Sequence, residues 1–312
     1  MPSSVQSFVR EILGSTRHIS WPLLNERCGC EVFVKHENHL PTGSFKVRGG
    51  VWYMEQLRRN NESVSGIVAA TRGNHGQSVA FAGTRAGLQV SVVVPEGNSE
   101  TKNRAMAGLG AQLVEHGRDF QDALDHAGAL AVKQGLHLIK PFHPWLVEGV
   151  GTYSLEFLEA VADLDTVYVP VGLGSGICGM LAAREMLGSH VEVVGVVAER
   201  ANTYEKSFRA GKVVEGCFPD TVADGLAVRI PNPDSLATML EGASRVVSVS
   251  DESILQAMKH YFTDTHNIAE GAAASALAAL IKEREIQNGK RIGLVLTGGN
   301  VDARIFKRAL DS

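Results

Sequence analysis

The 312-residue sequence predicts an α/β fold with two lobes and parallel-rich open sheets flanked by helices. Three observations support this expectation. Short runs of β-branched residues alternate with longer stretches of helical periodicity. Several short runs are continuously apolar, as in strands that are covered on both faces. Alternation of this length is typical of parallel sheets joined by right-handed crossovers.

The predicted elements are short strands separated by longer helices. Strands are expected at 31–35, 66–70, 89–94, 111–115, 137–140, 166–171, 191–198, 245–249 and 291–297. Helices are expected at 51–60, 77–86, 100–109, 120–134, 151–161, 178–187, 251–266 and 272–287. Because four short strand–helix units follow residue 50, we expect a small inserted domain over 50–145. The large domain would then consist of 1–49 and 146–312.

Composition narrows the classes of function. The sequence is 44% hydrophobic and 21% charged, and its formal net charge of -4 gives no basic excess for binding nucleic acid. No apolar run approaches the roughly 20 residues that span a membrane, and the first residues show no signal-peptide pattern. We therefore expect a cytoplasmic protein. The four cysteines lack zinc-site spacing, and we expect them to be reduced and structural.

The stretch 43–49, Gly-Ser-Phe-Lys-Val-Arg-Gly, follows the apolar run 32–34. It places Lys46 beside a flexible glycine, a hydroxyl and an aromatic ring. Most lysines in such a position are solvated loop charges. We predict instead that Lys46 holds an aldehyde cofactor as a Schiff base, because three later segments provide what such a cofactor needs.

The first of these segments is 71–78, directly after a predicted strand. Two glycines bracket Asn74 and His75, and a helix follows. Backbone amides at such a turn bind anions well, so a substrate carboxylate fits here, helped by Thr71 and Arg72. Taken alone, the segment is also explained as a glycine-rich turn that starts a helix.

The second segment, 172–179, is again a glycine loop between a strand and a helix, and it suits a phosphate. It also contains a complete G-x-G-x-x-G at Gly174, Gly176 and Gly179. Glu199 stands about 20 positions further on, as in dinucleotide-binding proteins. A nicotinamide-dependent oxidoreductase is therefore a serious alternative on this loop alone.

The third segment, 297–300, places Thr297 at the end of the last apolar strand, before two glycines. A hydroxyl there suits a buried contact to a ring atom, although a simple turn explains the pattern equally well. The order of all four segments is more specific than any one of them. From about residue 15 to residue 302 the sequence resembles the pyridoxal-phosphate-dependent serine/threonine dehydratases, of the tryptophan synthase β structural class (fold type II).

The resemblance implies a role for each matching residue. Lys46 would form the Schiff base with pyridoxal 5'-phosphate and then remove the substrate α-proton, for which its pKa must fall from about 10.4. Further cofactor contacts would come from Phe45, Asn74, Gly172, Leu173, Gly174, Ser175, Gly176 and Thr297. Substrate contacts would come from Ser44, Thr71, Arg72, Asn74 and His75. Glu270 would lie near the cofactor ring.

The implied reaction is that of an ammonia-lyase in amino-acid catabolism. The substrate would be a β-hydroxy amino acid, either threonine or serine or alternatively 3-hydroxyaspartate, converted to a 2-oxo acid and ammonia. The large domain would bind the cofactor, and the enzyme would be a homodimer. An amino-acid racemase of the same family is an alternative.

Two residues depart from the family pattern. The related serine racemases carry a serine acid/base where this chain has Arg72, and an arginine is a poor proton shuttle. We therefore expect little racemase activity. Arg72 either selects a second acidic group on the substrate or points to solvent. Leu173 and Ser175 stand where dehydratases commonly carry glycine.

Some family members bind a cation beside the phosphate loop. Glu199, the carbonyl of Thr203 and Glu205 reproduce the ligand spacing of that site. Oxygen ligands of this kind suit Mg²⁺ or Ca²⁺. The alternative is that these are surface acids near the start of a helix.

Overall fold

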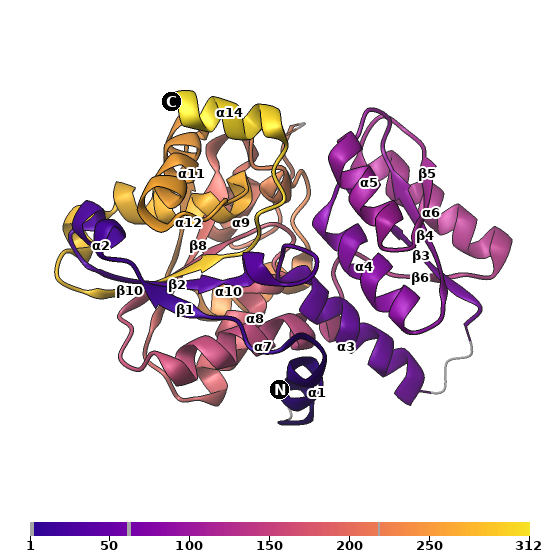
Figure 1. The fold of residues 1–312 in the computed structure, drawn as a ribbon, viewed down its shortest axis with the longest axis horizontal. Coiled ribbons are helices and arrows are strands. Elements are labelled where there is room, and N and C mark those ends of the chain that lie inside the picture. Colours follow the sequence, from indigo (N-terminus) through magenta and orange to yellow (C-terminus); the bar gives the residue numbers. More distant parts are fainter. Residues whose placement is uncertain (1–2, 61–63, 218) are drawn as a thin grey trace. The chain divides into compact units, whose positions relative to one another are not determined.

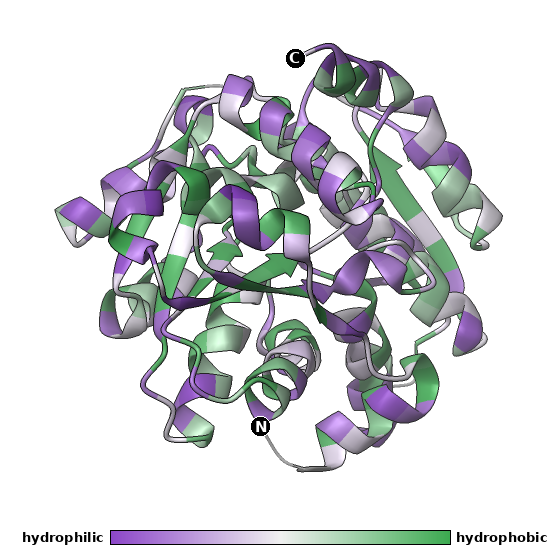
Figure 2. Ribbon diagram, turned by 60° about the vertical axis from the view of Figure 1, so that its left-hand side comes forward, coloured by the Kyte–Doolittle hydropathy of each residue, from purple (hydrophilic) through white to green (hydrophobic). Residues whose placement is uncertain are grey.

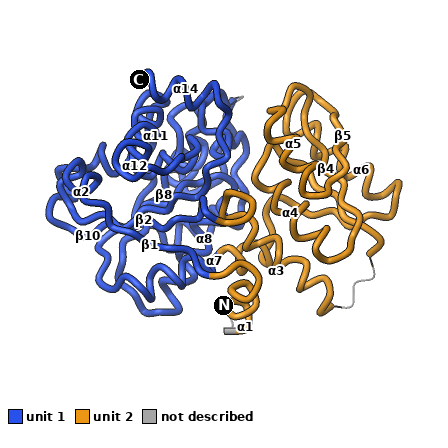
Figure 3. The backbone as a smooth tube through the Cα atoms, viewed as in Figure 1, with its two compact units in different colours: residues 1, 15–39, 151–312 blue, residues 2–14, 40–150 orange. Residues whose placement is uncertain are grey.

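The computed structural model describes residues 3–60, 64–217 and 219–312. The chain divides into two compact units, coloured blue and orange in Figure 3. Unit 1 contains Ser15–His39 and Gly151–Ser312, and unit 2 contains Pro2–Gly14 and Leu40–Val150. Residues 3–14, 40–49 and 146–150, which we expected in the large domain, are grouped with unit 2.

Unit 1 is built on a six-stranded sheet with the order β1-β2-β10-β7-β8-β9 (Figure 1). The strands are β1 (His18–Ser20), β2 (Glu31–His36), β10 (Arg291–Leu296), β7 (Thr166–Pro170), β8 (Glu192–Ala198) and β9 (Arg245–Val249). β1 is antiparallel to β2, and all other neighbours are parallel. The predicted α/β class is thus confirmed. The carboxyl ends of the parallel strands, followed by the predicted glycine loops, share one edge of this sheet.

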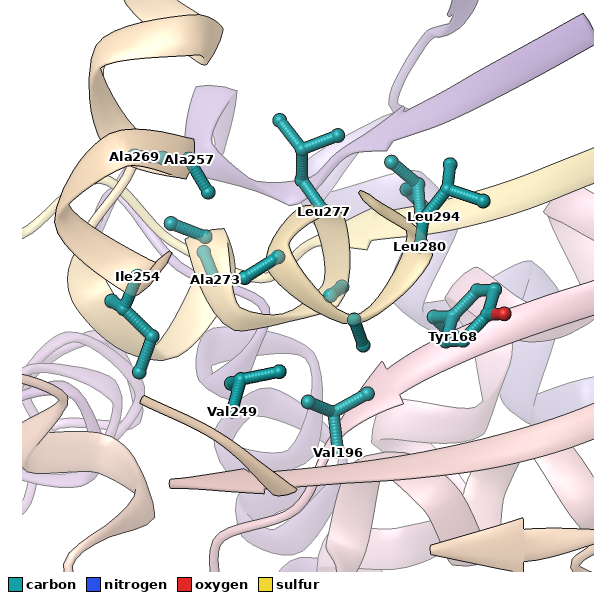
Figure 4. Packing of buried hydrophobic residues seen from close by; sticks show 14 of the residues in the cluster. Tyr168, Val196, Val249, Ile254, Ala257, Ala269, Ala273, Leu277, Leu280 and Leu294 are labelled. Atoms are coloured by element: carbon teal, nitrogen blue, oxygen red, sulfur yellow. The ribbon is translucent and has the colours of Figure 1, made fainter. Parts of the chain in front are cut away.

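Helix α12 (Gly271–Lys282) covers one face of this sheet. Its Ala273 and Leu277 lie in one buried cluster with Val196, Val249 and Leu294 of the strands (Figure 4). The alanine-rich sequence of α12 lets the helix lie close to the sheet. The other helices of unit 1 are α2 (Pro22–Cys28), α8 (Ser175–Met186), α9 (Thr203–Ala210), α10 (Pro233–Gly242), α11 (Asp251–Thr265), α13 (Arg284–Gln287) and α14 (Ala303–Asp311).

Unit 2 contains a four-stranded, fully parallel sheet in the order β5-β4-β3-β6. Its elements are α1 (Ser3–Leu13), α3 (Lys46–Arg59), β3 (Gly66–Ala70), α4 (Asn74–Arg85), β4 (Gln89–Val94), α5 (Glu100–Gly108), β5 (Gln112–Glu115), α6 (Phe120–Gln134) and β6 (His137–Leu138). Alternate residues of β3 enter different clusters: Ile67 packs with α3 and α4, whereas Val68 packs with α6. Helices therefore cover both faces, as the continuous apolar runs predicted.

Several element boundaries differ from the prediction. The main difference is that α3 begins at Lys46 rather than at residue 51. Gly49 and Gly50 suggest a helix break in the sequence, but here they allow close packing: a Cβ on Gly50 would lie 2.3 Å from Ser78 Oγ of α4. Strand β1 and helices α1, α2, α9, α10 and α14 were not predicted, and helix α7 (Pro144–Ala160) begins earlier than expected.

Hydropathy follows the expected pattern for such sheets. Figure 2 shows hydrophobic colour concentrated on strands, while many helices carry a hydrophilic and a hydrophobic side. Among the described residues, no helix combines the length and the apolar character needed to cross a membrane.

Candidate active site

The predicted site residues fall into two sets, one in each unit. Unit 2 contains Ser44, Phe45, Lys46, Thr71, Arg72, Asn74 and His75. Unit 1 contains Gly172, Leu173, Gly174, Ser175, Gly176, Glu270 and Thr297, together with Glu199, Thr203 and Glu205. Each set gathers residues that lie far apart in the sequence.

Lys46 is the first residue of α3, and Phe45 precedes it at the helix N-cap. The Nζ of Lys46 lies 4.8 Å from the centroid of the Phe45 ring, a cation–π contact. The Ser78 hydroxyl donates a hydrogen bond to the Lys46 carbonyl oxygen at 2.6 Å. This bond ties the start of α3 to α4, so the lysine is held beside the helix that follows the Gly73-Asn74-His75 loop.

The Thr71 hydroxyl organises that loop. Its Oγ1 accepts hydrogen bonds from the backbone N–H groups of Gly73, at 3.0 Å, and Gly76, at 3.2 Å. Thr71 is almost completely buried. In the structure its hydroxyl shapes the turn that leads into α4. The substrate contact that we predicted for Thr71 stays a prediction.

Among the described residues of unit 2, three polar side-chain atoms are buried without a hydrogen-bond partner. They are Ser44 Oγ, Arg72 Nε and His75 Nε2, and all belong to the two predicted segments. Buried polar groups in native proteins are nearly always hydrogen-bonded. Their clustering in these segments therefore marks them as groups that a ligand satisfies.

His75 is held in its neutral form. Burial, together with the positive charge of Lys46, lowers its pKa to about 3, although a hydrogen bond with the backbone of Ile139 acts in the opposite direction. At neutral pH the imidazole therefore carries no charge. It is able to orient a ligand by hydrogen bonding, while the fixed positive charge of this segment comes from Arg72.

In unit 1, the loop 171–174 leads from β7 into α8, which begins at Ser175. Gly174 is the N-cap of α8 and has a left-handed conformation, with φ of 97°. A Cβ on Gly172 would lie 2.3 Å from the Gly225 carbonyl oxygen. The loop is thus packed closely against the backbone at Gly225. Its amides and the amino end of α8 together form a site suited to a phosphate.

Three residues that the sequence did not single out support this loop. A Cβ on Gly174 would lie 2.5 Å from the Cβ of Ser235. The Ser235 Oγ and the Tyr204 hydroxyl are 2.6 Å apart, and the Tyr204 hydroxyl accepts a hydrogen bond from the Asn232 N–H at 3.0 Å. No local sequence signal identifies these contacts, because α9 and α10 meet the loop only in the folded chain.

Thr297 follows β10 and is 3% exposed. Beside it, the N–H of Glu270 donates to the Gly298 carbonyl oxygen at 3.0 Å. Asn267 connects this region to the end of β2: its Oδ1 accepts from Asn38 Nδ2 at 3.3 Å and lies 2.8 Å from His39 Nε2. Asn267 was not predicted as a site residue, and it fixes the chain just before the Lys46 segment.

The predicted metal ligands have other partners. Glu199 Oε1 lies 3.9 Å from Lys282 Nζ, and Glu205 forms an ion pair with Arg209 at 3.2 Å. Over 3–60, 64–217 and 219–312, no three His, Cys, Asp or Glu side chains are grouped as for a metal ion. The expected set contains only two such residues and a carbonyl, so it stays a prediction.

The residues present fit pyridoxal phosphate. Unit 1 offers a glycine loop at a helix amino end, which suits a phosphate. Unit 2 offers a lysine for an aldehyde and three unsatisfied polar atoms for a polar ligand. These are the chemical groups that such a cofactor and an amino-acid substrate require.

Comparison with known proteins agrees with this assignment. Residues 9–298 match the family model described as "Pyridoxal-phosphate dependent enzyme". The chain is 31% identical, over 96% of its length and 91% of the relative's, to L-threo-3-hydroxyaspartate ammonia-lyase of Saccharomyces cerevisiae. Its fold matches that of the processed threonine deaminase isoform 2 of Solanum lycopersicum, with a TM-score of 0.92, 29% identity and coverage of 98% and 90%. A pyridoxal 5'-phosphate-dependent aspartate racemase matches with a TM-score of 0.91, 28% identity and coverage of 96% and 95%.

Proposed function

The chain belongs to the family of pyridoxal-phosphate-dependent enzymes, and from this premise we propose that it is an ammonia-lyase acting on a β-hydroxy amino acid. Threonine, serine and 3-hydroxyaspartate are the substrates in question, each giving a 2-oxo acid and ammonia. Relatives with a threonine deaminase or a 3-hydroxyaspartate ammonia-lyase name support this class. The observation that carries the proposal is Lys46 at the start of α3, beside buried polar atoms without partners.

The predicted residues would bind pyridoxal phosphate. Lys46 holds the aldehyde, Phe45 packs on the ring, and Asn74 and Thr297 contact ring atoms. The phosphate is bound by the backbone of Gly172, Leu173, Gly174, Ser175 and Gly176. When bound, pyridoxal phosphate supplies an electron sink for the electron pair left at the substrate α-carbon.

The protein residues orient the substrate and move its proton. Ser44, Asn74 and His75 bind the α-carboxylate, while Thr71 keeps the loop in shape. With cofactor and substrate bound, neutral Lys46 would accept the α-proton. The β-hydroxyl takes this proton from Lys46 and leaves as water, and an incoming water then releases the nitrogen as ammonia and gives the 2-oxo acid. The reaction therefore needs one base, and no second acid/base on the opposite side of the α-carbon.

That requirement separates the lyase from a racemase, which must also deliver a proton to the opposite face. Arg72 precedes the Gly73-Asn74-His75 loop, and a guanidinium does not give up its proton at neutral pH. The presence of Arg72 therefore favours elimination over racemisation, although a solved aspartate racemase is among the similar structures.

The test combines a spectrum with an assay. The purified protein should show visible absorption from the bound cofactor and should release a 2-oxo acid from at least one β-hydroxy amino acid. Lys46→Ala should lose both properties, whereas Lys206→Ala, at an exposed position of α9, should keep them. A colourless protein that binds a nicotinamide dinucleotide would contradict the proposal.

A further inference from the structure

Arg72 is a partly buried cation without a protein counter-ion. It lies between the carboxyl end of β3 and the start of α4, and its Nε is buried with no hydrogen-bond partner. Among the residues that the structure describes, no carboxylate pairs with it. Two other half-buried arginines differ: Arg27 pairs with Asp264 and Arg245 pairs with Glu283, both at 2.6 Å.

An unpaired guanidinium in a partly buried position is costly, because it loses water without gaining an anion. A guanidinium group is charged at physiological pH. The surroundings add positive charge: the methylene chain of Lys102 lies over Gly73, 3.0 Å from where a Cβ would stand, and Lys46 is close enough to lower the pKa of His75. This part of unit 2 is therefore prepared for an anion.

One carboxylate does not use all of these groups. The proposed function already assigns the α-carboxylate to Ser44, Asn74, His75 and the amino end of α4. The guanidinium group of Arg72 is a second anion-binding group. Its planar fork of N–H donors matches a carboxylate by two parallel hydrogen bonds. β-Hydroxy amino acids with uncharged side chains, such as threonine and serine, offer no second carboxylate to the Arg72 guanidinium.

We propose that Arg72 binds a carboxylate on the substrate side chain, so that the preferred substrate is an acidic β-hydroxy amino acid of the 3-hydroxyaspartate type. This inference rests on the proposed function. Loss of water from 3-hydroxyaspartate and hydrolysis of the product give oxaloacetate and ammonia. Arg72 acts here as a specificity residue, and the base remains Lys46.

The first measurement is kcat/KM of the holoenzyme for L-threo-3-hydroxyaspartate and for L-threonine. Wild type should prefer the acidic substrate, and Arg72→Gln should reduce this preference by about 10- to 100-fold, the value of a charge-assisted pair. Arg72→Lys keeps the positive charge but loses the two parallel N–H donors, so its preference for the acidic substrate should fall between those of wild type and Arg72→Gln. Arg104→Gln, an exposed arginine of α5, serves as the control and should keep the wild-type preference.

The second measurement is independent of turnover. Calorimetric titration of the holoenzyme should show that Arg72→Gln weakens the binding of succinate by at least about tenfold and the binding of butanoate much less. Equal preference and equal succinate affinity in wild type and Arg72→Gln would overturn the inference. If no β-hydroxy amino acid is deaminated at all, the proposed function fails. A succinate affinity that still depends on Arg72 would then support an acidic ligand on its own.

Discussion

At the scale of single residues, His36 shows how burial controls a proton. Burial lowers its pKa to about 4, and the neighbouring His39 and Lys35 act in the same direction. The unfolded chain takes up a proton at this residue below about pH 6.5, whereas the folded chain does so only near pH 4. Between these values the unfolded state binds more protons, so stability falls as the pH drops from about 6.5 to about 4.

His36→Gln should remove this dependence. Glutamine offers an oxygen to the Trp21 indole N–H, which donates to His36 Nε2 at 3.2 Å in the native protein. The loss of unfolding free energy between pH 7 and pH 5 should therefore be smaller by about 2 kcal/mol in the variant. Urea unfolding at pH 7 and at pH 5 measures this difference in unfolding free energy. His190→Gln, at an exposed position, should leave the dependence unchanged; a steep dependence retained in His36→Gln would contradict the assignment.

Arg72 permits a second prediction at this scale. Wild type should convert L-serine to D-serine far more slowly than it deaminates L-serine, because no group opposite Lys46 exchanges a proton. Arg72→Ser should raise the ratio of racemisation to deamination at least about tenfold by providing a hydroxyl. Chiral chromatography beside a pyruvate assay gives both rates. Equal rates in wild type would show that another residue serves as the second acid/base.

At the scale of elements, local patterns predicted most of the sheet. β3, β4 and α6 occur over the residues expected from their apolar runs and periodicity, and α6 begins with Asp119 as its cap. The start of α3 could not be predicted in this way. Gly49 and Gly50 resemble a helix break until their neighbours are known, and the neighbour of Gly50 is Ser78.

The same distinction holds for the candidate site. Lys46 and the glycine loops could be predicted from the sequence, because each lies in one short segment with a recognisable composition. Ser78, Asn267 and Ser235 were not, because each acts through contacts with residues far along the chain. Whether Arg72 selects a substrate group or points to solvent was also open in the sequence; in the structure its Nε is buried and the residue is partly exposed, and its role stays a prediction.

The glycine loop before α8 gives a test at the element scale. Gly174→Ala adds a methyl group to a residue with φ of 97° and places it 2.5 Å from the Ser235 Cβ. Gly188→Ala has a similar left-handed strain, with φ of 58°, but meets open space. We expect a cost of about 1 kcal/mol for Gly188→Ala and roughly 2–4 kcal/mol for Gly174→Ala.

Urea unfolding and retention of the cofactor on dialysis measure these effects. Only Gly174→Ala should also lose pyridoxal phosphate, because only that loop is assigned to its phosphate. Equal costs for the two variants, with the cofactor retained in both, would mean that Ser235 moves aside and that the loop tolerates a side chain.

At the scale of the whole molecule, unit 1 is assembled from both ends of the chain. β2, from the amino-terminal part, pairs in parallel with β10, from the carboxyl-terminal part. Lys35 of β2 is fully buried, and its Nζ donates to Glu156 Oε2 of α7 at 2.7 Å and to the Thr16 carbonyl oxygen at 3.0 Å. This buried ion pair joins 15–39 to 151–312 within unit 1.

Removing one partner of this pair should therefore destabilise unit 1 strongly. Lys35→Met leaves the Glu156 carboxylate buried without its cation, which costs about 3–5 kcal/mol. The double variant Lys35→Met/Glu156→Leu removes both charges and should be closer to wild type than Lys35→Met alone. Arg209→Met, which breaks the exposed pair with Glu205, should cost less than about 1 kcal/mol.

Urea unfolding of the three variants beside wild type distinguishes two roles for the pair. If the double variant is as unstable as Lys35→Met, the ammonium is needed chiefly for its bond to the Thr16 carbonyl. If the double variant recovers most of the loss, the buried charge of Glu156 is the main cost. Apolar packing between β2 and β10 then suffices to hold the two ends of the chain in one sheet, because Val32 and Val34 lie opposite Ile292 and Leu294.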